Sequence, residues 1–580
     1  MSCDKLVYDL SQEVEGSPNV FIRKDWLNIL DNQNTNYQNN QSIIDTSQLS
    51  NSNKYMAYRE GYLSVPMLLS ARAAFNNAGG LVFKDYSLGL KNWFGTIIHS
   101  LTLDYNGTTI IQQTPLCNLW NSFKLLTTLS WNDVSTIGSS IGFYPDVPDS
   151  FQFDLANLNK SSLGINNNVL GQVFTSATGT LSQNIFTQQN GEIGGNIGAT
   201  FRTKWIAYNP SAPLGSGATY ANLLPAQSCK NIWKSYISTT QASAAAVNPI
   251  SAISIMGVIY LKHIHSFFNM VPLLKGVFMK LTLNLNNAST SITYTKADDA
   301  GTFLQCTNST VYVGGVQPIL VPSTKAGFGF SPDPAAGVYN VFFDLTVGAT
   351  CNNTDITTGG AVAGTLSKSV YLYVPAYTFN PTFEQAYLSQ NIKQIKYTDI
   401  YQYQITGANA ISPNGQFNNL ITNGIANIKS VLILPFYSTT MAIGSQPVIE
   451  YLSPFDTAGG GTCAPMASIN NFNVQIAGQN AIYNMQKYTF EEWVNQLNGC
   501  NAVNGGLTDG LTSGLIDFLG FSTSYPFYYV NVERMLPVEQ SVPKSVQILG
   551  TNQNALPLNL IIFIEYGVQI SIDVLTGARV

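Results

Sequence analysis

The stretch Leu101-Thr102-Leu103-Asp104-Tyr105-Asn106-Gly107 is the best guide to the fold, because a stretch of the same kind returns as Phe472-Asn473-Val474-Gln475-Ile476-Ala477-Gly478. Each alternates apolar and polar residues, as a strand with one buried face requires, and each ends in a turn sequence. A helical pattern with a central tryptophan follows each one, with Trp120 in the first and Trp493 in the second. This order recurs after 493 − 120 = 373 positions and indicates an internal duplication.

Both helical patterns carry start or stop signals. In the first, Thr114 is the expected N-cap and Pro115 the first helical residue, ahead of an apolar stripe of Leu116, Leu119, Trp120 and Phe123. In the second, Thr489 and Glu492 have the spacing of a capping box, and Gly499 is expected to end the helix. A weaker echo of the duplication pairs Val271-Pro272, before the run Val277 to Leu285, with Val542-Pro543, before Val546 and Ile548.

Period-two alternation dominates from about residue 58 onward, so the predicted fold class is mainly β. Two denser apolar runs, 431–434 and 560–564, predict strands buried on both faces. Two β units of about 200 residues each, together with an arm and long inserts, fit the length. We place the first unit, with its large loop insertions, at residues 58–388 and the second at residues 389–580. Small-residue stretches are expected to form loop insertions, at Thr175 to Ala199, Ser211 to Ala218, Ala288 to Gly301, and Gly348 to Gly364.

Residues 1–57 are predicted to form an amino-terminal arm. Residues 31 to 54 contain seven Asn and four Gln with hardly any apolar anchor, which is typical of an extended arm or loop rather than a core element. Before them, an apolar cluster around Phe21, Trp26 and Ile29 suggests that the arm docks onto a surface. The sequence leaves open whether that surface belongs to the same chain or to a neighbour.

The composition of the chain limits the classes of function. Asp, Glu, Lys and Arg make up only 10% of the 580 residues, against roughly a quarter in an average soluble protein. The hydrophobic fraction of 45% excludes general disorder, and the scarcity of charge excludes a coiled coil. A formal charge of −5 gives no electrostatic basis for wrapping nucleic acid, so we predict no sequence-specific nucleic-acid binding. A surface this poor in charge favours self-association.

Targeting and cysteine signals point to an intracellular origin. Met1 to Gln12 has charged residues among its apolar ones and no uninterrupted apolar core, so no secretory signal is expected. No segment reaches the 18 or more apolar residues of a membrane helix. Seven cysteines, an odd number, are scattered without a Cys-x-x-Cys pair, which favours reduced thiols and synthesis in a cytoplasm.

Histidines offer the first candidate site. His263 and His265 alternate, so on a strand both side chains would leave the same face, as a pair of metal ligands could. No carboxylate follows within the next five residues, and the third histidine, His99, lies in a different context. A structural role is therefore favoured, and we expect no metal site and no cofactor.

A second candidate is the Gly138-Ser139-Ser140-Ile141-Gly142 match to the nucleophile elbow of hydrolases. The elbow needs a turn between a strand and a helix, and the following Phe143 to Pro148 cannot start a helix. Phosphate-loop and His-Glu-x-x-His motifs do not occur. Exposed aromatic residues could stack on sugars, but Trp120 and Trp493 lie on patterned faces and favour core packing. We therefore predict no catalytic residue and no enzymatic activity.

Several stretches together resemble the double jelly-roll major capsid proteins of double-stranded DNA viruses, in particular those of polinton-like viruses and virophages. These landmarks span almost the whole chain in family order: 24–27 with 51–54 and 61–66, 267–276 with 280–284, 372–377, 421–427 with 429–436, and 563–566 with 572–573. The insertions do not align, so loop-borne properties such as receptor contacts do not carry over.

The resemblance implies two tandem eight-stranded antiparallel jelly rolls, with a few short helices and long loops. It further implies a major capsid protein that forms pseudo-hexagonal homotrimers, which tile an icosahedral shell around a double-stranded DNA genome. The partners would be copies of the chain itself, with minor capsid and penton proteins, and the location would be the virion. Contact with an internal membrane stays open.

Two alternatives remain at this point. One is a carbohydrate-binding or cupin-like β protein, such as a fibre, a minor capsid protein or an enzyme accessory. It predicts a saturable sugar or metal signal. The other is a minor vertex protein, which the duplicated pattern disfavours because such a protein normally carries one jelly roll.

Overall fold

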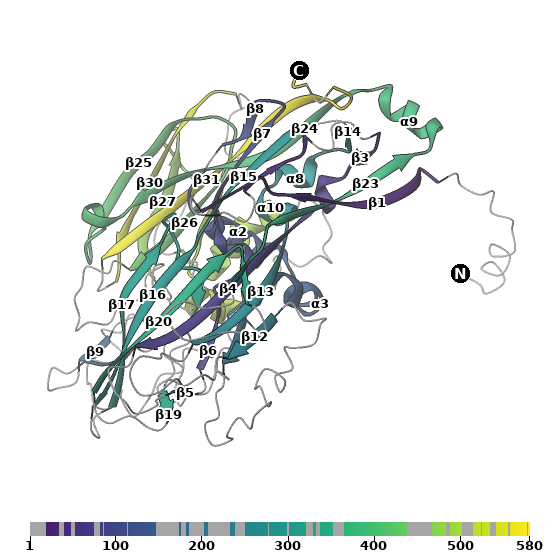
Figure 1. Cartoon of the computed structure of the whole chain (residues 1–580). Helices are drawn as coiled ribbons and strands as arrows, with labels where there is room; N and C mark the ends of the chain where they lie inside the picture. The colour runs from purple at the N-terminus through teal and green to yellow at the C-terminus, as the bar shows by residue number, and fades with distance from the viewer. Residues whose placement is uncertain are drawn as a thin grey trace, which may run out of the picture.

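The computed structural model shows two β sandwiches packed against each other, with the chain running from purple to yellow in Figure 1. It describes residues 19–33, 37, 40–47, 53–74, 82–84, 86–112, 114–146, 173–175, 181–184, 202–206, 233–237, 250–275, 278–297, 301–320, 329–331, 337–351, 365–437, 467–482, 488–501, 514–523, 525–533, 541–554, 557–576 and 578–580.

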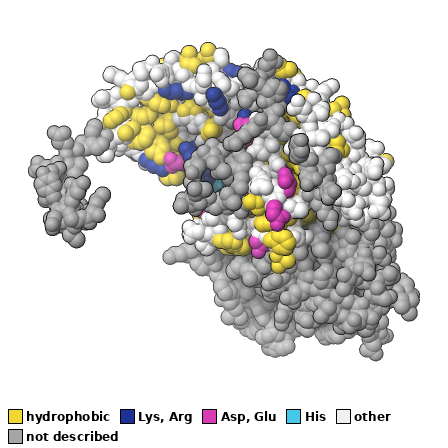
Figure 2. All heavy atoms as spheres, turned by 180° about the vertical axis from the view of Figure 1, so that it is seen from behind, with side chains coloured by type: hydrophobic (Ala, Val, Ile, Leu, Met, Phe, Trp, Pro, Cys, Tyr) yellow, Lys and Arg dark blue, Asp and Glu magenta, His cyan; other side chains and the backbone are white. Residues whose placement is uncertain are grey.

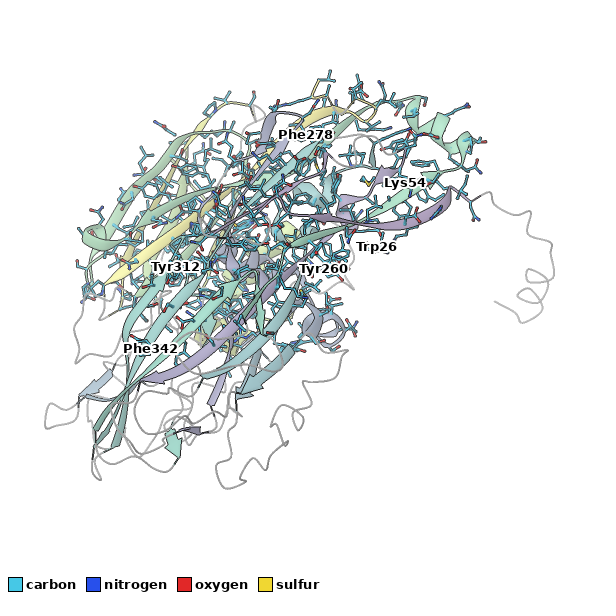
Figure 3. All side chains as sticks on the ribbon, viewed as in Figure 1. Trp26, Lys54, Tyr260, Phe278, Tyr312 and Phe342 are labelled. Carbon is cyan, nitrogen blue, oxygen red and sulfur yellow. The ribbon has the colours of Figure 1, made fainter. Side chains whose placement is uncertain are left out.

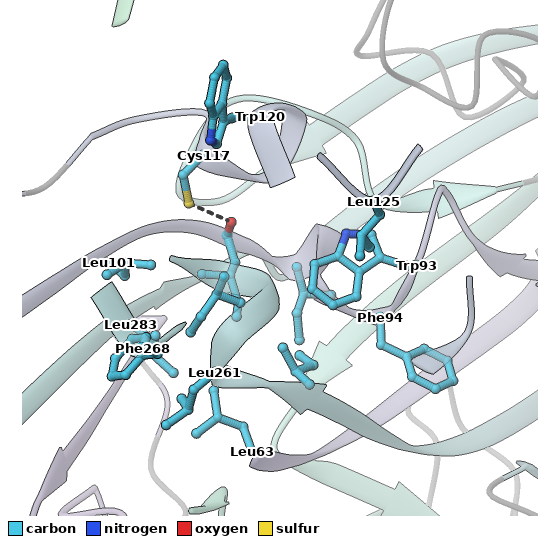
Figure 4. Packing of buried hydrophobic residues seen from close by; sticks show 14 of the residues in the cluster. Leu63, Trp93, Phe94, Leu101, Cys117, Trp120, Leu125, Leu261, Phe268 and Leu283 are labelled. Atoms are coloured by element: carbon cyan, nitrogen blue, oxygen red, sulfur yellow. Dashed lines mark hydrogen bonds between the residues drawn. The ribbon is translucent and has the colours of Figure 1, made fainter. Parts of the chain in front are cut away.

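The first sandwich consists of two antiparallel sheets around one apolar interior. One sheet has the order β1-β23-β4-β13, formed by Phe21–Leu30, Tyr371–Phe379, Tyr62–Ala74 and Ile250–Tyr260. The other has the order β2-β15-β7-β8, formed by Gln41–Asp45, Met279–Leu285, Ile98–Tyr105 and Thr108–Ile111. Figure 4 shows part of this interior, where Leu283 lies beside Phe268 and Leu63 beside Leu261.

The second sandwich repeats this arrangement at the carboxyl end of the chain. Its first sheet has the order β24-β31-β26-β29, formed by Ile392–Ile405, Leu558–Asp573, Ile428–Tyr437 and Tyr528–Asn531. Its second sheet has the order β25-β30-β27-β28, formed by Gln416–Ile425, Lys544–Asn552, Ile469–Ile476 and Gln479–Asn480.

Strand order identifies the architecture of both sandwiches. When the eight strands of each are numbered along the chain, one sheet reads 1-8-3-6 and the other reads 2-7-4-5 in both cases. Two facing four-stranded sheets connected in this way form a jelly roll. The predicted duplication is confirmed, because the strand with Leu101 and the strand with Phe472 are both fourth strands. The weaker echo is confirmed too, since β15 and β30 are both seventh strands.

The first jelly roll carries additional strands. Beyond β23, the same edge of β4 pairs with β20 (Gly337–Val347), followed by β16 (Ala288–Ala297) and β17 (Gly301–Val311). The remaining strands are β3 (Tyr55–Met56), β5 (Val82–Lys84), β6 (Tyr86–Leu90), β9 (Val173–Thr175), β10 (Leu181–Asn184), β11 (Thr203–Ile206), β12 (Trp233–Ile237), β14 (Leu274–Lys275), β18 (Ile319–Leu320), β19 (Gly329–Ser331), β21 (Ala349–Cys351) and β22 (Thr365–Ser367).

Two predicted loop insertions prove to contain strands. β16 occupies most of the stretch Ala288 to Gly301, and β21 lies within Gly348 to Gly364. β16 pairs on both edges, which holds its Ser and Thr residues in extended backbone, and its Thr and Ile residues are β-branched and suit a strand. Ser211 to Ala218 lies outside the described residues, as does Thr175 to Ala199 apart from Thr175 and β10.

The predicted arm is wrong as a structural unit. β1 pairs with β23 from Phe21 to Leu30, and β2 pairs with β15, so residues within 1–57 provide the first and second strands of the first jelly roll. The reason is that backbone pairing and a few inward side chains, such as Ile29 and Ile44, suffice to hold a strand at a sheet edge. The docking surface of the apolar cluster is therefore the chain's own sheet.

The runs predicted to be buried on both faces are confirmed. Val431 to Leu434 on β26 and Leu560 to Ile564 on β31 are all 0% exposed. Alternate residues face the interior of the second jelly roll, as Ile562 does, while Leu432 and Phe563 belong to a cluster continuous with the first jelly roll. The two jelly rolls therefore share a buried apolar junction.

The main helices lie between strands five and six of each jelly roll. They are α2 (Cys117–Thr128) and α3 (Trp131–Ile141) in the first, and α10 (Phe490–Asn501) and α11 (Phe518–Thr523) in the second. Shorter helices are α7 (Leu261–Ile264), α8 (Phe267–Met270), α9 (Pro381–Leu388) and the 3-10 turns η2 (Tyr58–Glu60), η3 (Phe94–Ile97) and η9 (Gly407–Asn409). No described helix is both long enough and apolar enough to cross a membrane.

The predicted helix ends are partly wrong. The cap of α2 is Leu116, in a left-handed backbone conformation, and not Thr114, because the Thr114 hydroxyl donates to the carbonyl oxygen of Ile400 in the second jelly roll. In α10 the Glu492 amide donates to the Thr489 hydroxyl, as expected of an N-cap. Gly499 lies within α10 and does not end it.

Candidate functional site at the junction of the two jelly rolls

Helix α2 of the first jelly roll lies against the outer face of the sheet β24-β31-β26-β29 of the second. The rings of Trp120 and Phe563 are 5.9 Å apart between centroids. Hydrogen bonds join the two bodies at the edge, where Tyr397 donates to the carbonyl of Ile110 at 3.0 Å and Thr114 to that of Ile400 at 3.1 Å. The predicted core roles of both tryptophans are confirmed, since Trp120 is 7% and Trp493 0% exposed.

A partly buried ion pair spans the junction. The Lys124 ammonium of α2 lies 3.5 Å from a Glu565 carboxylate oxygen on β31, and Ser430 donates a hydrogen bond to the same carboxylate at 2.8 Å. The Glu565 side chain is only 9% exposed. Burial by itself raises the pKa of the Glu565 carboxyl, but Lys124 and the hydrogen bonds from Ser430 and Thr398 outweigh burial, so its pKa is lowered. Glu565 is therefore ionised at neutral pH.

Next to this pair, a cleft of about 950 Å³ opens between the two jelly rolls. Its walls include Trp26 and Tyr260 from the first jelly roll, α2, and Asp399 and Glu565 from the second. His263 and His265 also line it. The cleft therefore contains the residues that the sequence singled out as candidate metal ligands, and its chemistry decides whether it could be an active site.

The two histidines do not share a strand, which is the arrangement that a metal pair would have required. His263 lies in α7 and His265 follows it, because the chain leaves β13 at Tyr260 and turns into a short helix. The His263 ring packs against Trp93 and Tyr260, with centroid distances of 6.1 and 5.7 Å. Burial, with a smaller contribution from Lys262, lowers the pKa of His263 to about 4. Its ring is therefore neutral at pH 7.

The ring of His265 is fully occupied by hydrogen bonds. Its Nε2 lies 3.3 Å from Asp399 Oδ1, and its Nδ1 accepts a hydrogen bond from the Phe267 amide at 3.1 Å. This pattern places the proton on Nε2 and leaves no free nitrogen to accept a proton from a nucleophile. His265 therefore ties the first jelly roll to β24 of the second and is not arranged as a general base.

Three described residues that could act as nucleophiles, Ser266, Cys117 and Ser140, are occupied as well. In the cleft, the Ser266 hydroxyl donates to the carbonyl of Thr398, and the Cys117 thiol donates to that of Ile98 at 3.5 Å (Figure 4). Burial raises the pKa of Cys117 to about 12, so it stays a neutral thiol. Ser140 of the Gly-x-Ser-x-Gly match lies in the last turn of α3 and donates to the carbonyl of Ile137. The motif is therefore a helix end, capped by Gly142, and not an elbow.

The third histidine, His99, is not among the residues that line the cleft. It lies on β7, and burial lowers its pKa.

Within the part of the chain that the structure describes, no group of three or more His, Cys, Asp or Glu residues could hold a metal ion. The residues around the cleft join the two jelly rolls through hydrogen bonds, apolar contacts and paired charges.

Sequence reasoning missed an aromatic surface on the first jelly roll. On the outer face of the sheet β1-β23-β4-β13, the Tyr62 ring stacks on Tyr373 at 5.1 Å and contacts Trp26 and Tyr260, each at 5.8 Å. Tyr371 continues the row next to Tyr373. We call these five residues the aromatic face. The alternation of Tyr371 and Tyr373 was a signal for it, but alternation alone does not tell which face is open.

The aromatic face is only partly covered. Trp26 is 52% exposed, and the four tyrosines are half-buried. Lys24 lies over the Trp26 ring at 5.5 Å and Lys262 over the Tyr260 ring at 5.4 Å, both within the range of a cation–π contact. Figure 3 shows Trp26 and Tyr260 close together on one flank of the molecule. A partly open aromatic row of this kind is a candidate interaction surface.

Comparisons with known proteins give one kind of match. No protein-family model and no curated protein matches the chain. Among solved structures, the chain is similar to the mavirus major capsid protein, with 9% identity, a TM-score of 0.46, and coverage of 98% of this chain and 92% of that chain. It is also similar to the Faustovirus major capsid protein (10% identity, TM-score 0.41, 98% and 94% covered) and to the Sputnik virophage structure (12% identity, TM-score 0.38, 97% and 88% covered).

The fold itself follows from this chain's own topology. Both sandwiches have eight strands connected in the same way, and helices occupy the same place in each, between strands five and six. Their strand order, 1-8-3-6 facing 2-7-4-5, makes this chain a double jelly-roll protein.

Proposed function

We propose that the chain is a viral major capsid protein that assembles with itself into pseudo-hexagonal homotrimers. The observation that supports this best is the pairing of two jelly rolls of the same topology within one chain. Three such chains around a threefold axis supply six similar bodies, which is the geometry of a hexagonal tile. The resemblance of the sequence landmarks to double jelly-roll capsid proteins supports the same role, and the solved structures of similar architecture include proteins named as major capsid proteins.

The composition and surface of the chain fit a protein covered by copies of itself. Charged residues make up only 10% of the sequence, so few charges must be desolvated when subunits pack. Large apolar side chains such as Trp26, Trp131 and Phe518 are more than half exposed in the single chain. Exposed side chains of this size are typical of interfaces rather than of free surfaces.

The finer parts of the proposal follow from the resemblance. The trimers would tile an icosahedral shell around a double-stranded DNA genome, with minor capsid and penton proteins as further partners and the virion as the location. The chain would be made in the host cytoplasm and would act without catalysis, cofactor or sequence-specific nucleic-acid binding. The saturated hydrogen bonds of His265, Ser266 and Cys117 in the cleft support a structural role.

Size-exclusion chromatography with light scattering on the purified full chain tests the proposal. We expect a stable species of about 189 kDa, three times the chain mass of 63.0 kDa. Negative-stain images of this species should show a hexagonal outline. A chain that stays monomeric at every concentration, up to the limit of solubility, would contradict the proposal.

A second candidate, carbohydrate binding, is favoured by one observation, the aromatic face. Tyr and Trp rings on an open sheet surface can stack on sugar rings, and Trp26 is the most exposed of them. Affinity electrophoresis in gels with neutral polysaccharides tests it. If the aromatic face binds sugar, polysaccharide in the gel should retard the chain in a saturable way, and Trp26→Ala should abolish this retardation. If the face only packs against other subunits, polysaccharide should leave the mobility of the chain unchanged.

A further inference from the structure

The cleft between the two jelly rolls has the size of a small-molecule site. Its volume of about 950 Å³ lies within the roughly 300–1,000 Å³ that such sites occupy. One stripe of α2 forms part of its wall, because Asn121, Lys124 and Thr128 are three or four positions apart and all line the cleft. Helix α7 contributes Lys262 and His263. The lining also contains apolar side chains, namely Leu101, Ile111, Leu125, Ile264 and Ile400.

Buried polar atoms without partners lie along this wall. Asn121 is only 3% exposed, and within the described part of the chain its Nδ2 has no hydrogen-bond partner. The same holds for Nδ1 of His263 and for Nε1 of Trp93, whose ring contacts the His263 ring. Figure 4 shows Trp93 beside Leu125 of α2. Because an amide nitrogen and an indole nitrogen can only donate, this wall favours a bound group that accepts hydrogen bonds.

The charged residues of the cleft give the bound group a sign. Glu60, Asp399 and Glu565 line the cleft, and each already accepts hydrogen bonds from this chain. Arg59 and Lys262 also line it and are exposed, and among the described residues neither forms an ion pair. The acids are therefore in use while two cations are available, which favours an anionic ligand.

The mouth of the cleft is aromatic. Trp26 and Tyr260 belong both to the aromatic face and to the lining of the cleft, so the cleft opens beside that face. Figure 2 shows hydrophobic side chains with Lys and Arg beside them on the flank where the described chain begins, which is the flank of β1. Aromatic and apolar walls suit a planar body that can stack on a ring.

We propose that the cleft binds a small planar organic anion, with its ring between α2 and α7 and its charged group at the mouth. An acceptor atom of the ring takes a hydrogen bond from Asn121, and the apolar lining covers the ring. Arg59 and Lys262 then pair with a phosphate or a carboxylate. Nucleotides and aromatic carboxylates share this chemistry. A single chain forms the whole site, so binding does not depend on assembly.

A ligand in this position would join the two jelly rolls. Asn121 and Lys262 come from the first jelly roll, whereas Thr398, Asp399 and Ile400 of the same lining come from β24 of the second. A group that binds the folded chain and not the unfolded one raises stability by mass action. The melting temperature of the chain should therefore rise with the concentration of the ligand.

Isothermal titration calorimetry of the full chain tests the proposal with four probes. Adenosine monophosphate and 4-hydroxybenzoate carry both a ring and an anionic group, adenosine carries the ring alone, and inorganic phosphate carries the charge alone. We expect at least one of the two complete probes to bind at one site per chain. Its affinity should exceed that of adenosine and of phosphate at least tenfold, and it should raise the melting temperature.

Three variants locate the binding in the cleft. Asn121→Asp replaces the amide donor by a carboxylate that repels an anion, and we expect affinity for the complete probe to fall at least tenfold. Lys262→Gln removes an exposed cation, and we expect a loss of at least fivefold. Lys396→Gln is the matched control, because Lys396 is an exposed lysine on β24 that does not line the cleft. Near-ultraviolet circular dichroism checks the fold, and if Asn121→Asp does not fold, the surface variant Lys262→Gln decides.

The outcomes separate a built site from chance contacts. Saturable binding of a complete probe that Lys262→Gln weakens and Lys396→Gln does not supports the proposal, and the tighter of the two probes tells phosphate from carboxylate. Phosphate that binds as tightly as both complete probes overturns it, because the cleft would then hold an adventitious ion only. Absence of saturation with both complete probes overturns it as well, since ordered water would then satisfy the buried donors. A chain that stays monomeric bears only on the capsomer proposal.

Discussion

Lys124→Met should weaken the junction between the two jelly rolls. At 3.5 Å, the attraction between Lys124 and Glu565 is about 5 kcal/mol for an effective dielectric constant of about 20 and about 1 kcal/mol in bulk water. The Lys124 side chain is 35% exposed, so solvent screens part of this attraction. The substitution leaves the buried Glu565 carboxylate with hydrogen bonds but without a counter-charge, and it removes the contact of the ammonium with the Trp120 ring. We expect a loss of about 2–3 kcal/mol.

Local hydrogen exchange measures this loss where it arises. The slowest amides of β31 and α2 should exchange about 30- to 160-fold faster in Lys124→Met, which corresponds to a loss of about 2–3 kcal/mol. Lys124→Arg is the matched control, since it keeps the charge. Glu565→Gln should cost less than Lys124→Met, because a neutral amide is cheaper to bury and Lys124 can turn to solvent. The double variant should therefore be more protected than Lys124→Met alone.

The same pair predicts a pH dependence with a definite sign. The pKa of Glu565 is lowered in the folded chain, so its contribution is fully present above the unfolded pKa of about 4.3 and is lost as the pH falls through the folded value. Protection of β31 should drop in strong acid in the wild type and much less in Lys124→Met. Equal protection of Lys124→Met and the wild type at neutral pH, within about a factor of two, would refute the reasoning, because it would mean that the ion pair contributes no net stability.

Three further outcomes follow from the structure. The pKa of His263 is lowered to about 4, so the folded chain prefers the neutral ring, and its stability is complete above about pH 6.5 and falls by about 2–3 kcal/mol towards pH 4. The melting temperature should therefore decline less steeply in acid for His263→Gln than for the wild type, and identical slopes would contradict this prediction. Gly142→Ala should lower the melting temperature more than Gly107→Ala. Both glycines have positive φ, but a Cβ at position 142 would lie 2.5 Å from the Phe94 ring, whereas a Cβ at position 107 would have no atom within 4 Å. Equal shifts in melting temperature would disprove the clash. Cys117 should resist iodoacetamide in the native chain and react after unfolding, because its thiol is buried and has a pKa of about 12. Mass spectrometry detects the labelling, and rapid labelling of Cys117 in the native chain would contradict this prediction.

The sequence by itself determined the strand content, the duplication and the two central strands of the sheet β24-β31-β26-β29. Alternation in Leu101 to Tyr105 and in Phe472 to Ile476 marks strands with one buried face, and their equivalent places in the two jelly rolls follow from the turn and helix after each. The runs at 431–434 and 560–564 lack alternation because both of their faces are covered. These features are local, and a one-dimensional pattern records them directly.

The candidate site depended on contacts between distant residues, which the sequence pattern does not contain. Asn- and Gln-rich residues near 41 look like an arm, yet Gln41–Asp45 form a strand because β15 pairs with them. Thr114 looks like a helix cap, yet it bonds to Ile400, 286 positions away. His263 and His265 look like a strand pair, yet the chain turns after Tyr260 and His265 meets Asp399 instead.

The tertiary structure also decided which of two similar faces is covered. The outer faces of β1-β23-β4-β13 and of β24-β31-β26-β29 both carry apolar and aromatic residues, but only the second is buried by α2 within the chain. Tyr371 and Tyr373 alternate with buried residues as any surface strand would, and nothing in their spacing tells whether a neighbour covers them. The sequence therefore determined how each jelly roll folds, because strands and their turns are local. Packing alone decided where the junction and the open aromatic face lie, because burial depends on which bodies meet in space.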